Sequence, residues 1–195
     1  MLGFRVCDAQ AVKSSGFVFS AGKGLPMYHL PAGSELGIPF DVESSYLKHS
    51  FSAGIGYRLR LQRNGSRFFT DVALGAQYNR YQYNVGYLSG TDGVSYAGGN
   101  GNCNLLSFSA SVGAGYYLYK GLSLSVGLEP TYYVWDKTFF DLPAFIRLGY
   151  DFKSVEVALA YRVGTLRNFH LAPFQGIHLS QWELSVCVPL WRRND

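Results

Sequence analysis

The chain has 195 residues and a net charge of +4, and 48% of its residues are hydrophobic while only 15% are charged. Globular proteins carry about 25% charged residues, so the surface of this protein is short of charge. An aromatic content of 16% excludes an intrinsically disordered chain. The Lys and Arg residues are scattered, with a single pair at Arg192-Arg193, which argues against a nucleic-acid partner.

No apolar run approaches the roughly 18 residues that a membrane-spanning helix requires. A helical membrane protein is therefore excluded, but a membrane barrel is not, because its hydrophobic residues alternate with polar ones. Tyr and Phe make up most of the aromatic residues and Gly is abundant, and all three favour strands and tight turns over helices.

The N-terminal residues 1–11 end in Ala9-Gln10-Ala11, a small-residue pattern typical of signal-peptidase sites. We interpret 1–11 as the remnant of a signal peptide and 12–195 as a single domain; a frayed terminus is the alternative. The cysteines are Cys7, Cys103 and Cys187, too few for a disulfide scaffold or a zinc site.

Apolar and polar residues alternate with period two from Leu47 to Gln62, which predicts a strand with two distinct faces. His49, Phe51, Ile55 and Tyr57 share the apolar face, and Asn64-Gly65 makes a tight turn after the strand. Six further segments alternate in the same way: 68–87, 106–118, 122–134, 140–152, 155–164 and 182–190.

Irregularities in these segments predict local departures from regular strands. The phase of the alternation changes after Tyr78, which a bulge or the exit of the strand from a membrane would explain. Pro130 predicts a break in its strand, because proline cannot donate a ladder hydrogen bond. Ser89–Asn102 is Gly-rich and is predicted to be a long loop, and Lys120-Gly121 and Lys153-Ser154 are predicted to be turns.

An eighth strand is needed, because bacterial single-chain barrels have an even number of strands. The candidates are 16–25 and 34–43, and we favour 16–25 as the first strand. The first and last strands must then pair, since an open edge in lipid leaves backbone groups without partners at several kcal/mol each. We therefore predict an all-β, eight-stranded, antiparallel up-and-down transmembrane β-barrel.

Three features favour a membrane barrel over a soluble one. The polar face is rich in Gly, Ser and Ala, which suits a narrow lumen. Several strands have ten or more alternating residues, and a tilted strand crosses a bilayer in about 9–11. Aromatic residues recur toward strand ends, as the girdles at membrane interfaces require. The girdle predicted from this recurrence consists of Tyr57, Tyr78, Tyr116, Tyr132, Tyr150, Trp182 and Trp191.

Connection lengths predict the orientation of such a barrel. The short turns would face the periplasm together with both termini, and the long connections would face outside. Cys103 would then lie near the outer rim and Cys187 near the inner rim, too far apart for a disulfide.

The pattern over 16–191 resembles the small outer-membrane β-barrel proteins of the OmpX, OmpA-barrel and PorT-like kind. The alternation from Trp182 to Trp191 is similar to the C-terminal strand that the barrel-assembly machinery reads, although residues 192–195 follow it here. The resemblance implies the outer membrane of a Gram-negative bacterium, with lipid and lipopolysaccharide as surroundings.

The polar face carries eight ionisable residues that would point into the lumen. They are expected to pair, because an unpaired buried charge is costly. A structural plug of salt bridges is the favoured interpretation, and a polar track for solute or protons is the alternative. The eight residues are Arg58, Arg60, Asp71, Glu129, Arg147, Glu156, Arg162 and Glu183.

An enzymatic alternative rests on His178, Ser180 and Glu183. Lipid A deacylases of the PagL type resemble this chain in size and use a His-x-Ser pair with a Glu, but here Glu183 is expected on the opposite face. The sequence contains no spacing of residues typical of metal ligands and no phosphate-binding glycine loop, and we expect no cofactor. The leading hypothesis is a non-enzymatic structural or accessory subunit that could bind partners through its long outer loops, ahead of a narrow channel and this enzyme.

Overall fold

The computed structural model describes residues 15–24, 26–27, 40–42, 46–85, 88–90, 95–96, 99–152, 155–171 and 174–190. Four predictions lie outside these residues: the signal-peptide remnant 1–11, the turn at 153–154, the connection at 172–173 and the girdle position Trp191. The described part is all-β, as the alternation predicted, and its strand pairs are antiparallel.

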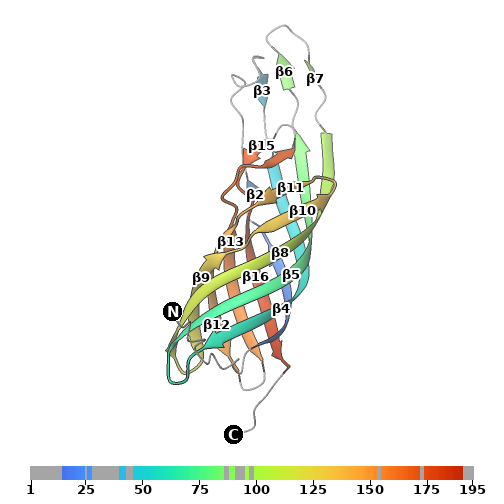
Figure 1. Ribbon diagram of the computed structural model, residues 1–195. Helices are drawn as coiled ribbons and strands as arrows, with labels where there is room; N and C mark the ends of the chain where they lie inside the picture. The colour runs from blue at the N-terminus through green and yellow to red at the C-terminus, as the bar shows by residue number, and fades with distance from the viewer. Residues whose placement is uncertain are drawn as a thin grey trace, which may run out of the picture.

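Eight strands form a closed antiparallel ring in which each strand pairs with its neighbours along the chain (Figure 1). The order around the ring is β1-β4-β5-β8-β9-β12-β13-β16, and β16 pairs back with β1. The choice of 16–25 as the first strand is confirmed, because β1 pairs with both β4 and β16 and closes the ring. The strands are β1 (Gly16–Lys23), β4 (Tyr46–Gln62), β5 (Phe68–Val85), β8 (Gly99–Tyr119), β9 (Leu122–Leu128), β12 (Ala144–Asp151), β13 (Glu156–Val163) and β16 (Ser180–Pro189).

Two prolines interrupt the ring without opening it. Pro130 separates β9 from β10 (Thr131–Trp135), which confirms the predicted break. Pro143 separates β11 (Phe139–Asp141) from β12, a second break that the alternation did not reveal. Each proline lacks a donor but still accepts: the Glu129 N–H donates to the Pro143 carbonyl at 2.8 Å, and the Ala110 N–H donates to that of Pro130 at 3.1 Å.

The short strands collect at one end of the ring (Figure 1). β2 (Pro26–Met27) pairs with β4, β14 (Phe169–Leu171) pairs with β15 (Phe174–Ile177), and β3 (Phe40–Val42), β6 (Leu88–Gly90) and β7 (Ser95–Tyr96) form a separate three-stranded sheet. We call this the loop end. Of the alternative first strand 34–43, residues 40–42 thus belong to β3, outside the ring, and the rest lies outside the described residues.

The prediction of a loop over Ser89–Asn102 was wrong in part. Gly99–Asn102 belong to β8, where they pair with Gln82–Val85. β7 and the last two residues of β6 also lie within the predicted loop. Glycine content alone suggested a loop, but the pairing of these residues with a long neighbouring strand holds them extended.

The opposite end of the ring carries the tight turns, and we call it the turn end (Figure 1). The Ser66 N–H donates to the Arg63 carbonyl at 3.0 Å across a turn in which Gly65 has φ 74°. Lys120 and Gly121 also have positive φ, at 35° and 91°. Both predicted turns in the described part are confirmed. Gly65 and Gly121 adopt the left-handed region that glycine tolerates, and Lys120 adopts a positive φ beside Gly121.

Of the two explanations of the phase change after Tyr78, a bulge in β5 is wrong, and the exit of the strand from a membrane stays a prediction. β5 pairs with β8 in regular register from Phe68 to Val85, so Tyr81 points inward on the same face as Asp71. The bulge lies instead on β4, between His49 and Phe51. His49, expected on the outward face with Phe51, is consequently buried inside the ring. The alternation of apolar and polar residues changes after Tyr78 because the interior of the ring is lined by apolar side chains at the level of Tyr81.

The ring is packed closely enough that glycine is needed inside it. A β-carbon on Gly115 would overlap the ring of Phe69, which lies 3.9 Å beneath the guanidinium of Arg60. We expect Gly115→Ala to lower the free energy of unfolding by about 1–3 kcal/mol through this overlap. Gly99→Ala is the matched control in the same strand, because nothing lies within 4 Å of a β-carbon there. Equal urea denaturation of the two variants would contradict the expectation.

Candidate functional site

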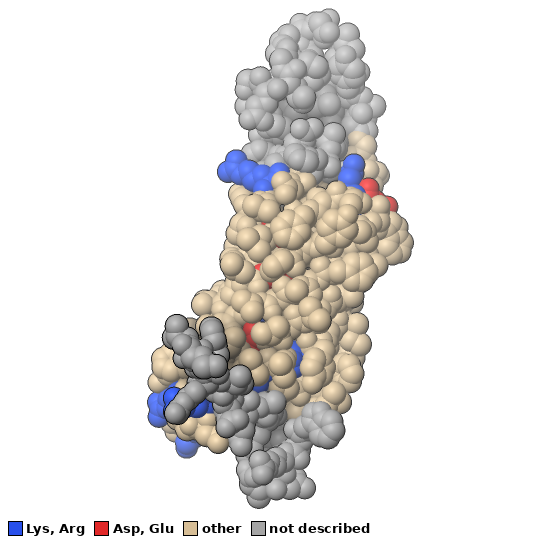
Figure 2. Space-filling model, in the orientation of Figure 1, with Lys and Arg blue, Asp and Glu red and all other residues tan. Residues whose placement is uncertain are grey.

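The outward face of the ring is apolar over most of its height. Side chains exposed there include Phe19, Ile55, Leu74, Phe108, Val112, Val126, Ile146, Leu148 and Leu184. Among the described side chains, the exposed charged ones all lie toward the ends of the ring: Lys23, Arg63, Arg67, Lys120, Asp136, Lys137 and Arg167. On the face drawn in Figure 2, the surface between the groups of Lys and Arg at the two ends shows only a few charged atoms.

The inward face carries the eight ionisable residues that the alternation selected. Arg58, Arg60, Asp71, Glu129, Arg147, Glu156 and Glu183 are buried, and Arg162 is nearly so. Charged residues are almost never fully buried in soluble proteins unless they are paired. The distribution is thus inverted relative to a soluble fold: ions inside, apolar side chains outside.

The half of this network nearer the turn end is centred on Arg60. Its guanidinium binds Asp71 through two hydrogen bonds of 2.7 Å, donates to Glu156 at 2.7 Å and reaches the hydroxyl of Tyr117 at 3.0 Å. Arg58 holds both oxygens of Glu156, at 2.5 and 2.9 Å. These two-pronged contacts match the planar guanidinium to the carboxylate and connect β4, β5 and β13 across the interior.

The other half of the network is centred on Arg162. It forms ion pairs with Glu183 and, at 3.1 Å, with Glu129. Gln77 donates to Glu183 at 2.8 Å. Arg147 lies between the two halves, 3.9 Å from Asp71, and packs on the ring of Phe145. Four arginines and four carboxylates therefore neutralise one another.

Little free space remains around these side chains. A cavity of about 60 Å³ borders Gln77, Glu129, Arg147, Arg162 and Glu183, and a second of about 20 Å³ lies nearer the loop end. Spaces of this size hold a few water molecules at most. In the described part of the chain, these charged side chains crosslink the strands, and the cavities that border them are small.

An apolar plug, which sequence reasoning missed, fills the interior at the loop end. It consists of Leu47, Tyr81, Cys103, Leu105, Tyr133, Phe169, Ile177 and Leu179. Phe139 stacks on Tyr133 at 4.4 Å between ring centroids and meets Phe169 edge-on at 5.5 Å. The sequence signal for this plug is that, after Tyr78, aromatic residues occupy the positions that point inward instead of those that point outward.

The described members of the predicted girdle lie on the outward side toward the strand ends. Tyr57, Tyr116 and Tyr150 are nearer the turn end; Tyr78, Tyr132 and Trp182 are nearer the loop end. Most have an aromatic neighbour on the next strand or beside them in the chain: Phe17 with Tyr57, Phe68 with Tyr116, Tyr150 with Phe152 and Tyr161 with Trp182. Phe17, Phe68 and Trp135 belong to these rows and were not predicted.

The structure does not bring His178, Ser180 and Glu183 together as a catalytic set. The carboxylate of Glu183 is buried inside the ring with Arg162 and Gln77. His178 has its Nδ1 2.8 Å from the Gly164 carbonyl and its Nε2 3.2 Å from Nε of Arg167. Both ring nitrogens are therefore engaged, and the histidine is held as a link between β16 and the segment after β13.

Other site chemistry is sparse in the described residues. They contain no group of three His, Cys, Asp or Glu side chains that could hold a metal ion. Cys103 and Cys187 are buried, neither is in a disulfide, and they lie toward opposite ends of the ring. The described residues also form no helix that is long and apolar enough to cross a membrane.

Comparison with models of known protein families and with curated proteins gives no match to this chain. The function is therefore inferred from the geometry of the ring itself.

Proposed function

We propose that this chain is an eight-stranded transmembrane β-barrel of the outer membrane of a Gram-negative bacterium, acting as a structural or accessory subunit. The observation that carries the proposal is the inverted distribution of side chains. Leu74 is 66% exposed on the outward face, whereas Arg60 is fully buried inside. Hydrocarbon is the surrounding in which this arrangement is stable, since the apolar face meets lipid and the ions meet one another.

The height of the apolar face fits a bilayer. On β5 the outward positions from Phe68 to Tyr78 are apolar or neutral, and Arg80 is the first outward charge beyond them. About 11 residues at about 3.3 Å each, tilted by about 40°, rise about 27 Å, close to the apolar band of about 25 Å in such barrels. Closure of the ring supports the same environment, because it leaves no strand edge to lipid.

The two ends support an orientation. Tight turns at one end and longer connections at the other are the pattern of outer-membrane barrels, in which the turns and both termini face the periplasm. In that orientation the β3-β6-β7 sheet stands outside the cell, where it and the neighbouring connections would be available to partners.

The filled interior favours a closed barrel over a channel. Two layers block the axis: the ion network nearer the turn end and the apolar plug at the loop end. The channel hypothesis would require both layers to part. No observed arrangement favours the deacylase alternative, because its three residues are not assembled.

We expect the reconstituted barrel to show no regular conductance steps in planar bilayers. Insertion should be established separately by protection of the strands from protease in liposomes. A lack of conductance steps then cannot be explained by failure of the protein to enter the bilayer. Regular single-channel steps of the inserted protein would favour the channel.

Crosslinking and pull-down from native outer membranes should recover partners attached at the loop end; recovery of the barrel alone would contradict the accessory role.

A further inference from the structure

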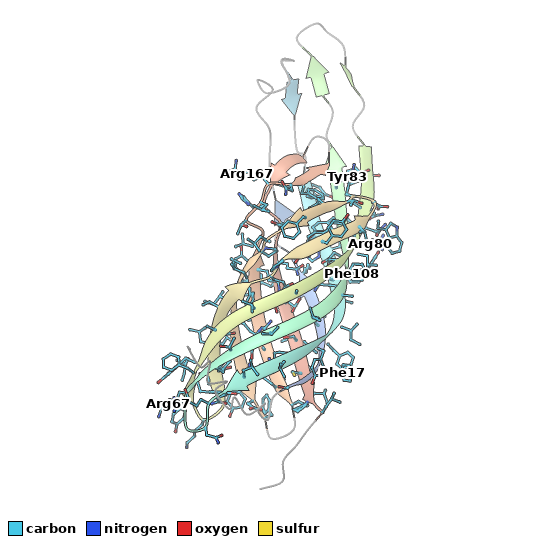
Figure 3. The ribbon with its side chains drawn as sticks, viewed as in Figure 1. Phe17, Arg67, Arg80, Tyr83, Phe108 and Arg167 are labelled. Carbon is cyan, nitrogen blue, oxygen red and sulfur yellow. The ribbon has the colours of Figure 1, made fainter. Side chains whose placement is uncertain are left out.

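A polar surface lies on the outward side of β4, β5 and β8 immediately above the apolar band. Pairing register places its residues in three rows: Tyr46, Asn84 and Asn100; Lys48, Gln82 and Asn102; Arg80 and Asn104. The opposite, inward side of the same strands carries Leu47, Tyr81 and Cys103 of the apolar plug. Figure 3 shows Arg80 on the flank of the molecule, between Phe108 and Tyr83 in height.

Five of these eight residues are carboxamides, which is unusual for strands. Asn is depleted in strands because it packs poorly there, and a merely solvated strand face would more often carry Thr, Lys or Glu. Each carboxamide both donates and accepts hydrogen bonds. Gln82, Asn100 and Asn102 are exposed and form a paired surface of donors and acceptors.

An aromatic platform borders this surface on the membrane side. Trp135 is 66% exposed although its backbone has φ 99°, a conformation that costs about 1–3 kcal/mol for such a residue. Its ring meets Tyr78 edge-on at 6.1 Å, and the Tyr78 hydroxyl donates to Oδ1 of Asn104 at 2.7 Å. Asp136 accepts from the Asn104 backbone N–H at 2.6 Å. The strained Trp135 is thus held beside the carboxamides.

Arg80 supplies a partly exposed cation to this surface. Its Nε atom is buried, so the end of the guanidinium is the part that can meet a ligand, and Arg80 forms no ion pair with the described residues. Lys48 lies in the adjacent row of the same face. Because guanidinium and ammonium groups are the side chains that recognise phosphate, the two cations favour an anionic, phosphate-bearing ligand.

We propose that this surface binds the phosphorylated saccharide headgroup of an outer-leaflet glycolipid of the lipopolysaccharide type. The inference rests on the proposed function, which places the surface at the outer edge of the bilayer. Saccharide hydroxyls match the carboxamides, the faces of sugar rings match exposed Trp135, and the phosphates match Arg80 and Lys48. The acyl chains of the same molecule would lie against the apolar band directly below.

The test is binding of purified lipopolysaccharide to the full chain in phospholipid nanodiscs, measured by native mass spectrometry. We expect Arg80→Ala and Trp135→Ala each to weaken binding about tenfold or more, the loss typical of one charge-assisted hydrogen bond or one aromatic contact. Arg67→Ala is the control, since Arg67 is an exposed cation at the turn end. Dephosphorylated lipopolysaccharide should lose the dependence on Arg80 and keep that on Trp135.

Two further ligands separate the sources of binding. Inorganic phosphate should bind far more weakly than lipopolysaccharide, and phosphatidylglycerol should be insensitive to Trp135→Ala. Equal affinity of both variants and wild type for lipopolysaccharide would overturn the proposal. It would also be overturned if the two substitutions weakened binding of phosphatidylglycerol as much as they weaken binding of lipopolysaccharide. Insertion into the nanodisc is recorded separately, so failure to insert contradicts the proposed function, whereas insertion without selective binding contradicts only this inference.

Discussion

Leu74→Arg is expected to destabilise the inserted protein by about 2–4 kcal/mol and to reduce its recovery in the membrane fraction. Leu74 lies on the outward face of β5 within the apolar band, and it is 66% exposed. In a soluble protein, a charge at so exposed a position would be harmless or would improve solubility. The predicted loss arises because the arginine would have to stand in hydrocarbon, and urea denaturation in liposomes measures it.

Tyr119→Arg is the matched control. Tyr119 is also 66% exposed, but it precedes the Lys120-Gly121 turn, where the proposed orientation puts the membrane interface. Arginine at an interface costs about 0–1 kcal/mol, so this variant should insert as the wild type does. If Leu74→Arg also behaved like the wild type, and the protein stayed soluble and folded without detergent, the outward face would be in contact with water and the membrane assignment would fail.

Arg60→Met is expected to lower the free energy of unfolding by about 3 kcal/mol or more. Arg60 is fully buried and binds two carboxylates, Asp71 and Glu156. Methionine keeps much of the side-chain volume but leaves Asp71 with Arg147 at 3.9 Å as its nearest cation. A buried carboxylate without a close partner is costly, and denaturant titration of the reconstituted protein gives the difference.

The double variant Arg60→Met/Asp71→Leu separates charge from packing. It removes one cation and one anion together and leaves the Arg58–Glu156 pair in place. Replacing a buried ion pair by apolar residues is often close to neutral, so the double variant should regain part of the lost stability. Arg63→Met, at an exposed turn position, should have little effect. A double variant less stable than Arg60→Met alone would show that the loss comes from packing around Phe69 and Tyr117.

The buried ion pairs make the interior of the ring a set of crosslinks between strands. The ion pairs join strands that are distant in sequence; Arg60 and Glu156, for example, are 96 residues apart. A network of this kind favours one register and one closure of the ring, because a strand shifted by one residue would turn its charges to the outward, apolar face. Under the proposed function, the ring would give the loop end a stiff base from which to present a surface.

The strands themselves could be predicted from the sequence, because side-chain alternation is a local property. Residues two apart lie on one face, so the pattern from Phe68 to Tyr78 indicated a strand and its two faces without knowledge of any neighbour. The Asn64-Gly65 turn and the break at Pro130 followed from backbone chemistry in the same local way. The eight inward charges were found for the same reason.

Only the tertiary structure decided what depends on partners far along the chain. The first strand was settled by the pairing of Gly16–Lys23 with β4 and β16, and the short strand at 40–42 was left outside the ring. The pattern after Tyr78 suggested a shift in β5, whereas the bulge lies in β4 and the interior becomes apolar there. Alternation shows which residues share a face. Long-range pairing decides which face is inside, and at which level of the ring the interior changes from ionic to apolar side chains.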